Sequence, residues 1–182
     1  GLPSWKALNE CADLFTTAGS GGKGRYLDGP MDWHGQETLD RIEALDMDFT
    51  AKFAGSSGAL WAELKSAAKD NRAVVVFNWS PNFTDSGMGG SFVEFPAYSD
   101  GCKKSDGGDG MCGSAPAGWL KKAAYYQMPK KWPAAYKIYN NISFTKGDIG
   151  NMAALVDIDG MSHEAAAAKW LADNETTWKS WL

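Results

Sequence analysis

Two tryptophans in this sequence stand where an open parallel sheet would present them to a ligand. Trp33 follows a short strand predicted at residues 25–28, and Trp79 follows the continuous apolar run at residues 73–77. Such a run is typical of a parallel strand buried on both faces, and ligands of open α/β sheets lie beyond the carboxyl ends of the strands. An indole there can hold a trimethylammonium group, which donates no hydrogen bond, by cation–π attraction of about 2 kcal/mol or more per desolvated ring.

The same tryptophans could instead fill the core. The chain contains nine Trp, eight Phe and six Tyr among its 182 residues, and large aromatic side chains dominate cores as well as binding sites. Asp32, next to Trp33, would add long-range attraction for a cation. The residue types leave both interpretations open, a cation-binding aromatic box and a packed core.

Motifs for catalysis or metal binding fail in their details. Lys23 lies in a Gly-rich stretch, but the flanking residues do not match a phosphate-binding loop. The pair His163-Glu164 lacks the second His of a zinc-protease helix, because Ala167 stands there. The acidic stretch at 157–160 lacks the spacing of a calcium loop. We therefore expect no catalytic residues, no metal site and no cofactor.

Charge and hydropathy argue against a nucleic-acid partner and against a membrane-spanning segment. The formal net charge is −4, and Lys and Arg are scattered singly, whereas a nucleic-acid partner requires a clustered basic face. No apolar run reaches the length of a membrane span. We expect neither nucleic-acid binding nor a transmembrane segment in this sequence.

The cysteines point to a compartment. Cys102 and Cys112 are ten residues apart in a loop rich in Gly, Asp, Ser and Lys, and their spacing fits no zinc template. A disulfide would supply the constraint that this loop lacks, about 3 kcal/mol in the loop-entropy model. This favours a Cys102–Cys112 disulfide and an oxidising, extracytoplasmic location. Cys11 shares a predicted helical face with Leu8 and Phe15, and we expect it to be buried.

Strands and helices alternate in the first half of the chain. The periodicity predicts helices at 4–15, 36–45 and 57–70 and strands at 25–28, 48–53, 73–77 and 91–95. This order indicates an open α/β sheet. The second half is mostly helical: a strand is predicted at 119–126, followed by helices at 133–142, from Thr145 to about 156, and from Ser162 through Leu182. With so few strands, this half is expected to be part of a lobe whose other part lies elsewhere.

Around Trp33 and Trp79 the sequence resembles the family of glycine betaine/proline betaine-binding proteins of ABC importers. The resemblance is carried by Leu2-Pro3-Ser4-Trp5-Lys6-Ala7-Leu8, by Asp32-Trp33-His34-Gly35 and by Val76-Phe77-Asn78-Trp79-Ser80-Pro81-Asn82 followed by Phe92-Val93-Glu94-Phe95-Pro96. Gly118-Trp119-Leu120-Lys121-Lys122 and the Trp-rich end extend it over nearly the whole chain.

The resemblance implies a two-lobed, type II periplasmic-binding-protein-like α/β fold, a quaternary-ammonium ligand and a membrane-embedded ABC permease as partner. It implies that Trp33 and Trp79 belong to an aromatic box, with Asp32, His34 and Asn82 as neighbouring ligand-binding candidates. Family members are usually longer, and the part without a counterpart is the N-terminal stretch of the first lobe. We expect an α/β ligand-binding lobe at 1–96, a disulfide-closed crossover at 97–117 and the C-terminal part of the other lobe at 118–182. That incomplete lobe should expose apolar surface and favour association.

Two other functions compete with solute binding. A carbohydrate-active enzyme or lectin would use tryptophan platforms, and its acid pair would have to come from Asp28 or Asp32 with Asp85. A sensor or structural module of the same fold would bind no ligand. Which quaternary amine is preferred does not follow from these residues.

Overall fold

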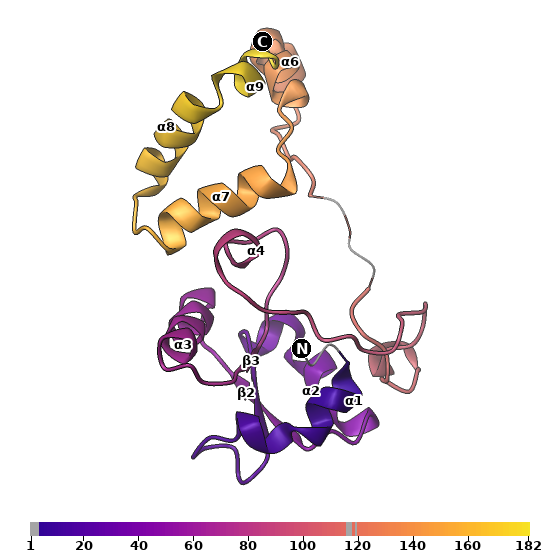
Figure 1. The fold of residues 1–182 in the computed structure, drawn as a ribbon. Coiled ribbons are helices and arrows are strands. Elements are labelled where there is room, and N and C mark those ends of the chain that lie inside the picture. The colour runs from indigo at the N-terminus through magenta and orange to yellow at the C-terminus, as the bar shows by residue number, and fades with distance from the viewer. Residues whose placement is uncertain (1–3, 116–117, 119) are drawn as a thin grey trace. The chain divides into compact units, whose positions relative to one another are not determined.

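The computed structural model describes residues 4–115, 118 and 120–182 (Figure 1). The chain forms two compact units. The first combines Gly1–Asn78 with Ser91–Ala117, and the second combines Trp79–Gly90 with Gly118–Leu182. Each unit is described separately below.

A parallel three-stranded sheet forms the centre of the first unit. Strand β1 (Gly24–Asp28) lies between β2 (Phe49–Phe53) and β3 (Val75–Val76), in the order β2-β1-β3. The last residue of β1, Asp28, pairs in register with Phe53 at the end of β2. The predicted α/β class is confirmed, and the strands that precede Trp33 and Trp79 are hydrogen-bonded neighbours.

Helices cover both faces of this sheet. In Figure 1, α3 (Ser57–Lys69) lies on one side, and α1 (Trp5–Glu10) and α2 (Gln36–Ala44) lie on the other. Ser4 and Ser56 cap α1 and α3, because their hydroxyls accept hydrogen bonds from the amides of Ala7 and Ala59. The core between the sheet and the helices consists of Leu8, Ala12, Phe15, Tyr26, Leu45, Met47, Phe49 and Val75.

The predicted helix at 4–15 is interrupted at Cys11. α1 ends there, and the 3-10 turn η1 (Ala12–Phe15) follows, because Cys11 leaves the helical region with φ −114° and ψ 24°. The free thiol of Cys11 is in a half-buried residue, so its predicted full burial is wrong. The bend turns Ala12 and Phe15 into the core while leaving Cys11 at its margin.

The predicted strand at 91–95 is also wrong. Its only strand-like pairing among the described residues is an isolated bridge between Glu94 and Ser4, with the Trp5 amide donating to the Glu94 carbonyl at 3.0 Å. A single bridge does not make a ladder, although the segment packs Val93 and Phe95 against the core. Strand β3 spans two residues rather than the predicted five.

The disulfide between Cys102 and Cys112 is confirmed, with the two Cα atoms 6.1 Å apart. Within its loop, a short 3-10 turn, η3, spans Lys104–Asp106 and ends at Gly107, which adopts φ 88°. Glycine takes that left-handed conformation without steric cost.

The second unit contains helices and no strand among its described residues. Its helices are α4 (Thr84–Gly87), α5 (Met128–Lys131), α6 (Pro133–Asn141), α7 (Lys146–Asp157), α8 (His163–Asp173) and α9 (Glu175–Lys179). The capping box predicted at Thr145 is confirmed, with Asp148 as its reciprocal member. The single helix predicted from Ser162 to Leu182 is divided at Asn174, which leaves helical geometry with φ −121°. The strand predicted at 119–126 does not form at 120–126, and Trp119 lies outside the described residues.

A small aromatic core holds the last helices of this unit together. The rings of Trp170 and Trp181 stack with centroids 5.8 Å apart, and Phe144 meets each of them edge-on at 5.3 Å. Other apolar side chains of the unit are exposed, among them Leu120 (69%) and Tyr126 (79%). None of the helices described here is long and apolar enough to cross a bilayer.

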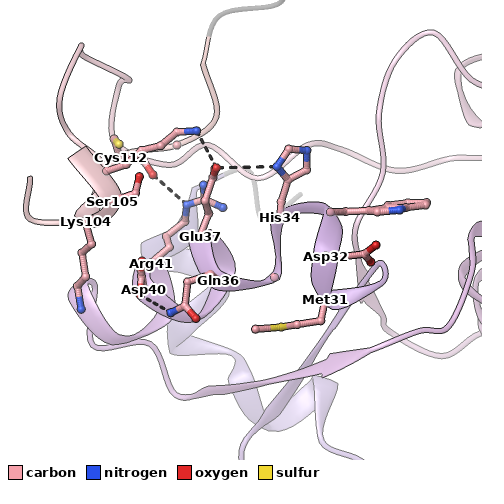
Figure 2. A pocket seen from close by; sticks show the side chains of 15 residues that line it. Met31, Asp32, His34, Gln36, Glu37, Asp40, Arg41, Lys104, Ser105 and Cys112 are labelled. Carbon is pink, nitrogen blue, oxygen red and sulfur yellow. Dashed lines mark hydrogen bonds and ion pairs between the residues drawn. The ribbon is translucent and has the colours of Figure 1, made fainter. Parts of the chain in front are cut away.

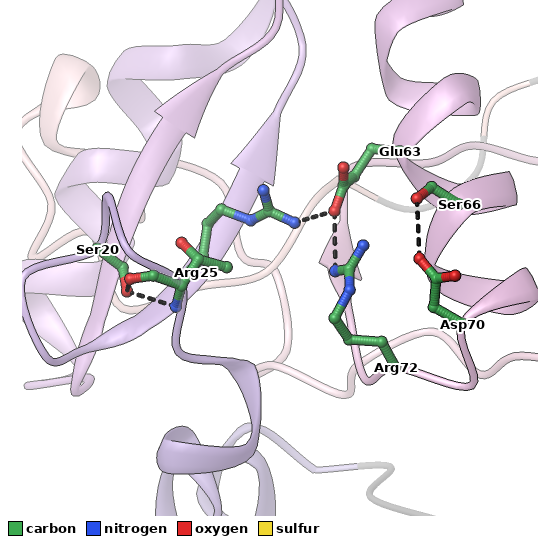
Figure 3. A network of polar contacts seen from close by, with 7 residues as sticks. Ser20, Arg25, Glu63, Ser66, Asp70 and Arg72 are labelled. Atoms are coloured by element: carbon green, nitrogen blue, oxygen red, sulfur yellow. Dashed lines mark hydrogen bonds and ion pairs between the residues drawn. The ribbon is translucent and has the colours of Figure 1, made fainter.

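A network of ion pairs joins β1 to α3 on the face of the sheet that α3 covers (Figure 3). The Glu63 carboxylate accepts hydrogen bonds from Arg25 of β1 and, at 3.0 Å, from Arg72 beyond α3. Burial alone would raise the pKa of Glu63, but the hydrogen bonds and the positive charges of Arg25 and Arg72 together lower the pKa below its usual 4.5.

Replacing Glu63 by Gln should therefore lower the free energy of unfolding by about 1 kcal/mol at pH 7. Because the folded-state pKa is depressed, this contribution is complete above the unfolded pKa and disappears as the pH falls through the folded value. Urea denaturation of both proteins should show a constant difference from pH 7 to about 5, which shrinks below about 4.5. Glu10→Gln, at an exposed position, is the matched control, and a Glu63→Gln difference that persists unchanged at pH 3 would contradict the assignment.

Candidate ligand-binding site

The candidate site begins in a wide helical turn that connects β1 to α2. This π-type turn, η2, spans Met31–Gly35, and within it His34 leaves helical geometry with φ −139° and ψ 15°. Single turns of this type often occur at functional sites, because they re-aim side chains within a helix. Here the turn brings Trp33 and His34 out at the carboxyl end of the sheet.

Trp33 is positioned by a glycine and an aromatic ring. A Cβ atom at Gly29 would lie 2.5 Å from Cε3 of Trp33, so the indole rests directly on the Gly29 backbone. The Phe77 ring meets the Trp33 ring nearly edge-on, with centroids 6.1 Å apart. About 40% of Trp33 is exposed to solvent. The indole is thus held by its neighbours and is still accessible to a ligand.

Phe77 lies beside both Trp33 and His34, and it was not predicted as a site residue from the sequence. Its amide donates to the Leu27 carbonyl at 2.7 Å, which continues the pairing of β3 with β1 for one residue beyond the strand. Its ring also lies 6.0 Å from the His34 ring. Its position at the end of the apolar run at 73–77, the same kind of strand end as the one before Trp33, was the signal that could have identified it.

A pocket of about 270 Å³ opens between η2, α2 and the disulfide loop (Figure 2). Three of the predicted site residues line it: Asp32, Trp33 and His34. On the other side it is lined by the loop residues 103–105 and 110–113, apart from Met111. The structure therefore brings these three predicted residues to one pocket within the first unit.

Cationic side chains attach the disulfide loop to α2. Lys103 forms an ion pair with Glu37 at 2.7 Å, and Lys104 forms one with Glu43 at 2.6 Å. The hydrogen bond to Glu37 raises the pKa of Lys103 above its usual value. Nδ1 of His34 lies 3.9 Å from the same Glu37 carboxylate. Glu37 therefore joins the loop to the turn that carries Trp33.

Arg41 forms the buried part of this attachment. It is 8% exposed, and its Nε donates to the Cys112 carbonyl at 2.9 Å. The guanidinium lies 4.8 Å from the centroid of the Phe95 ring and also hydrogen-bonds the Tyr26 side chain. Burial raises the pKa of Tyr26, the Arg41 charge opposes this rise, and the Asp28 carboxylate adds to it. Nothing in the local sequence around Arg41 indicated this role.

The other two predicted site residues belong to the second unit. Trp79 is 38% exposed, in keeping with a ligand-contacting side chain. Asn82 is 5% exposed, and its Oδ1 accepts a hydrogen bond from the Phe83 amide at 2.8 Å. The Asn82 carboxamide oxygen thus stabilises its own turn, and its ligand contact stays a prediction.

Asp85, the acid proposed for a glycosidase pair, is engaged within the second unit. It accepts hydrogen bonds from the Asn82 amide (2.9 Å) and the Ser80 hydroxyl (2.8 Å), and Lys146 of α7 lies 3.4 Å away. Burial would raise the pKa of Asp85, but these hydrogen bonds and the lysine charge hold it below its usual value. A general acid needs a raised pKa, so Asp85 does not suit that role.

Among the described residues, no group of three or more His, Cys, Asp or Glu side chains is arranged to hold a metal ion. The fold, with aromatic side chains at the carboxyl end of a parallel sheet, is that of the periplasmic-binding-protein class. The chain belongs to the family described as the substrate binding domain of ABC-type glycine betaine transport systems, OpuAC, which matches residues 1–173. Members of this family are solute-binding proteins rather than enzymes.

Two curated relatives differ in their similarity to this chain. The trimethylamine N-oxide-binding protein of Pelagibacter ubique (strain HTCC1062) is 54% identical over 182 residues, which are 98% of this chain and 57% of the relative. The glycine betaine/carnitine transport binding protein GbuC of Listeria monocytogenes serotype 1/2a (strain 10403S) is 24% identical over 137 residues, 75% of this chain and 41% of the relative. The chain thus spans little more than half the length of the first relative.

Two solved structures share the fold. Lactococcal OpuAC, in its closed-liganded conformation complexed with glycine betaine, matches with a TM-score of 0.57 and 19% identity, covering 86% of this chain and 57% of that one. An ABC-transporter choline binding protein in complex with choline matches with a TM-score of 0.61 and 19% identity, covering 100% and 58%. These likenesses confirm a periplasmic-binding-protein fold of which this chain is a part.

Replacing Gly29 by Ala should displace the Trp33 indole, because the new methyl group would overlap the ring. In protein labelled with 5-fluorotryptophan, the fluorine resonance assigned to Trp33 through Trp33→Phe should shift more than any other. Gly55→Ala is the matched control, since no atom lies within 4 Å of its Cβ position. An unchanged Trp33 resonance in Gly29→Ala would contradict the contact.

Replacing Arg41 by Met should lower the free energy of unfolding of the first unit by about 2–3 kcal/mol, because the Cys112 carbonyl loses its charged donor. Lys should restore little of this loss, since it lacks the planar fork that reaches several partners. Urea denaturation with the disulfide intact measures the effect. Lys104→Met, which removes an exposed ion pair of the same loop, should change stability little, and equal effects of both substitutions would contradict the role of Arg41.

Proposed function

We propose that this chain is the ligand-binding part of an extracytoplasmic substrate-binding protein that delivers a trimethylated amine to an ABC importer. The observation that carries this proposal is the 54% identity, over 98% of the chain, to a protein that binds trimethylamine N-oxide. We place trimethylamine N-oxide first among the ligands. Glycine betaine comes second, in keeping with the family description and with the glycine betaine complex of a structural relative.

These ligands share the group that the sequence features predict. Trimethylamine N-oxide, glycine betaine and choline all carry three methyl groups on a positively charged nitrogen, and they differ in the oxide, carboxylate or hydroxyl beyond it. A charge spread over methyl groups is best met by aromatic faces, which combine cation–π attraction with apolar contact. The ligand expected from the sequence was a glycine betaine-like quaternary amine, and trimethylamine N-oxide contains the same head group.

Trp33 and Trp79 are the residues that we assign to this head group. Each is more than one-third exposed although tryptophan is usually largely buried, and each follows a strand of the sheet or its immediate extension. The pocket beside Trp33 also presents the carboxylate of Asp32, whose negative charge favours a cation. His34 completes this side of the pocket as a polar neighbour.

The partners follow from the same assignment. A membrane-embedded permease would receive the solute from this protein, as the transport system of the family requires. The Cys102–Cys112 disulfide supports an oxidising compartment outside the cytoplasm. The exposed apolar side chains of the second unit, Leu120, Tyr126 and Leu182 among them, support association of this unit with further polypeptide.

Isothermal titration with trimethylamine N-oxide, glycine betaine and choline tests the proposal. We expect saturable binding of at least one of them and a loss of about thirtyfold or more in affinity for Trp33→Ala and for Trp79→Ala, the equivalent of about 2 kcal/mol per ring. Trp132→Ala, which removes an exposed tryptophan of α5–α6, should bind like the unmodified chain. Binding that survives both Trp33→Ala and Trp79→Ala would contradict the aromatic box, and failure of the unmodified chain to bind any of the three would contradict ligand binding by these residues.

A further inference from the structure

Asp28 carries a buried carboxylate that the site described so far does not use. It is the last residue of β1 and is 1% exposed. One oxygen, Oδ1, accepts a hydrogen bond from the Gly29 amide at 2.7 Å. The other, Oδ2, is buried without a hydrogen-bond partner in the part of the chain that the structure describes. An ionised carboxylate buried in this way destabilises the protein unless another charge balances it.

The two nearby arginines form their hydrogen bonds and ion pairs with groups other than Asp28. Arg41, on the same face of the sheet, donates to the Cys112 carbonyl and interacts with Tyr26. Arg25 points to the opposite face, where it pairs with Glu63 of α3. Tyr26 is close enough to Asp28 for the two to interact electrostatically, but its hydroxyl carries no positive charge. None of these neighbours therefore gives Oδ2 of Asp28 a direct hydrogen bond in the part of the chain that the structure describes.

Gly29 lies between this carboxylate and the Trp33 indole and contacts both. Its amide is held by Oδ1 of Asp28, and its Cα supports the Trp33 indole, which a Cβ atom would meet at 2.5 Å. Asp28 therefore lies behind the residue on which Trp33 rests. In a poorly solvated interior a charge acts over several ångströms with little screening. Its potential therefore extends across Gly29 toward the indole.

We propose that Asp28 is a specificity-determining residue whose buried negative charge is balanced when a cationic nitrogen binds against Trp33. This inference rests on the proposed function, because it requires a trimethylated amine at Trp33. Asp28 acts through the electric potential and not through a hydrogen bond, since a trimethylated nitrogen has no hydrogen to donate. It orients a ligand such as trimethylamine N-oxide, with the nitrogen toward Trp33 and the oxide away from it.

The substitution Asp28→Asn separates this role from a structural one. The amide has nearly the same shape and its oxygen can still accept from Gly29, while the charge is lost and an NH2 group replaces Oδ2. Without ligand, the variant should melt at the same temperature as the unmodified chain or at a higher one, because a buried charge whose Oδ2 has no hydrogen-bond partner among the described residues has been removed. Its affinity for trimethylamine N-oxide, and for glycine betaine, should fall by about tenfold. The matched control is Asp13→Asn, an exposed aspartate of η1, which should change neither quantity.

Each other outcome has a definite meaning. If Asp28→Asn binds trimethylamine N-oxide as well as the unmodified chain does, the electrostatic role is overturned and the proposed function stands. If the variant melts at a lower temperature or fails to fold, the charge stabilises the turn and the proposal is likewise overturned. If the unmodified chain binds no trimethylated amine, the proposed function fails first and the role of Asp28 falls with it. That result is evident before any variant is compared.

Discussion

A buried guanidinium must find acceptors inside the protein, and the way Arg41 does so constrains the first unit. Its donors reach the Cys112 carbonyl and the Tyr26 side chain, and its flat face lies near Phe95. One side chain of α2 therefore contacts the disulfide loop through Cys112, the central strand β1 through Tyr26, and the segment around Phe95. Because leaving any of these acceptors unpaired would be costly, the loop cannot leave α2 without breaking a charged hydrogen bond.

This attachment matters for the site because α2 begins where the Trp33 turn ends. The same helix carries Glu37, which pairs with Lys103 of the loop and lies near His34 of the turn. From the other side, the turn is fixed by Gly29 and by the Phe77 ring at the end of β3. The exposed indole is thus held by Gly29 and Phe77, and the helix that follows its turn is fixed by a covalently closed loop, as a preorganised binding wall requires.

The elements of the sheet and its covering helices could be predicted from the sequence because their signals are local. Gln36–Ala44 and Ser57–Lys69 follow apolar periodicity, and the parallel arrangement of β1, β2 and β3 follows from strand–helix alternation. The failures have non-local causes. The segment around Glu94 has strand-like residues but, among the described residues, pairs only with Ser4. Asn174 interrupts a helix whose apolar pattern continues beyond it.

The same distinction holds within the site. Trp33 could be singled out because a strand end and a turn are visible in the sequence. Arg41 could not, because its acceptor Cys112 is 71 residues away. Asp28 looks like any acidic residue at a strand end until its burial is known. Asn82 illustrates the opposite case, since a promising position next to Ser80-Pro81 has a carboxamide oxygen bonded to the adjacent backbone amide.

The central claim is that a trimethylated nitrogen binds against the Trp33 indole. The most direct test is NMR magnetisation transfer to trimethylamine N-oxide in a deuterated chain whose tryptophan rings alone carry protons. We predict strong transfer from the indoles to the N-methyl protons, and a large part of it should disappear in Trp33→Phe prepared in the same way. Transfer that is absent, or that is the same with and without the Trp33 indole, would contradict the account.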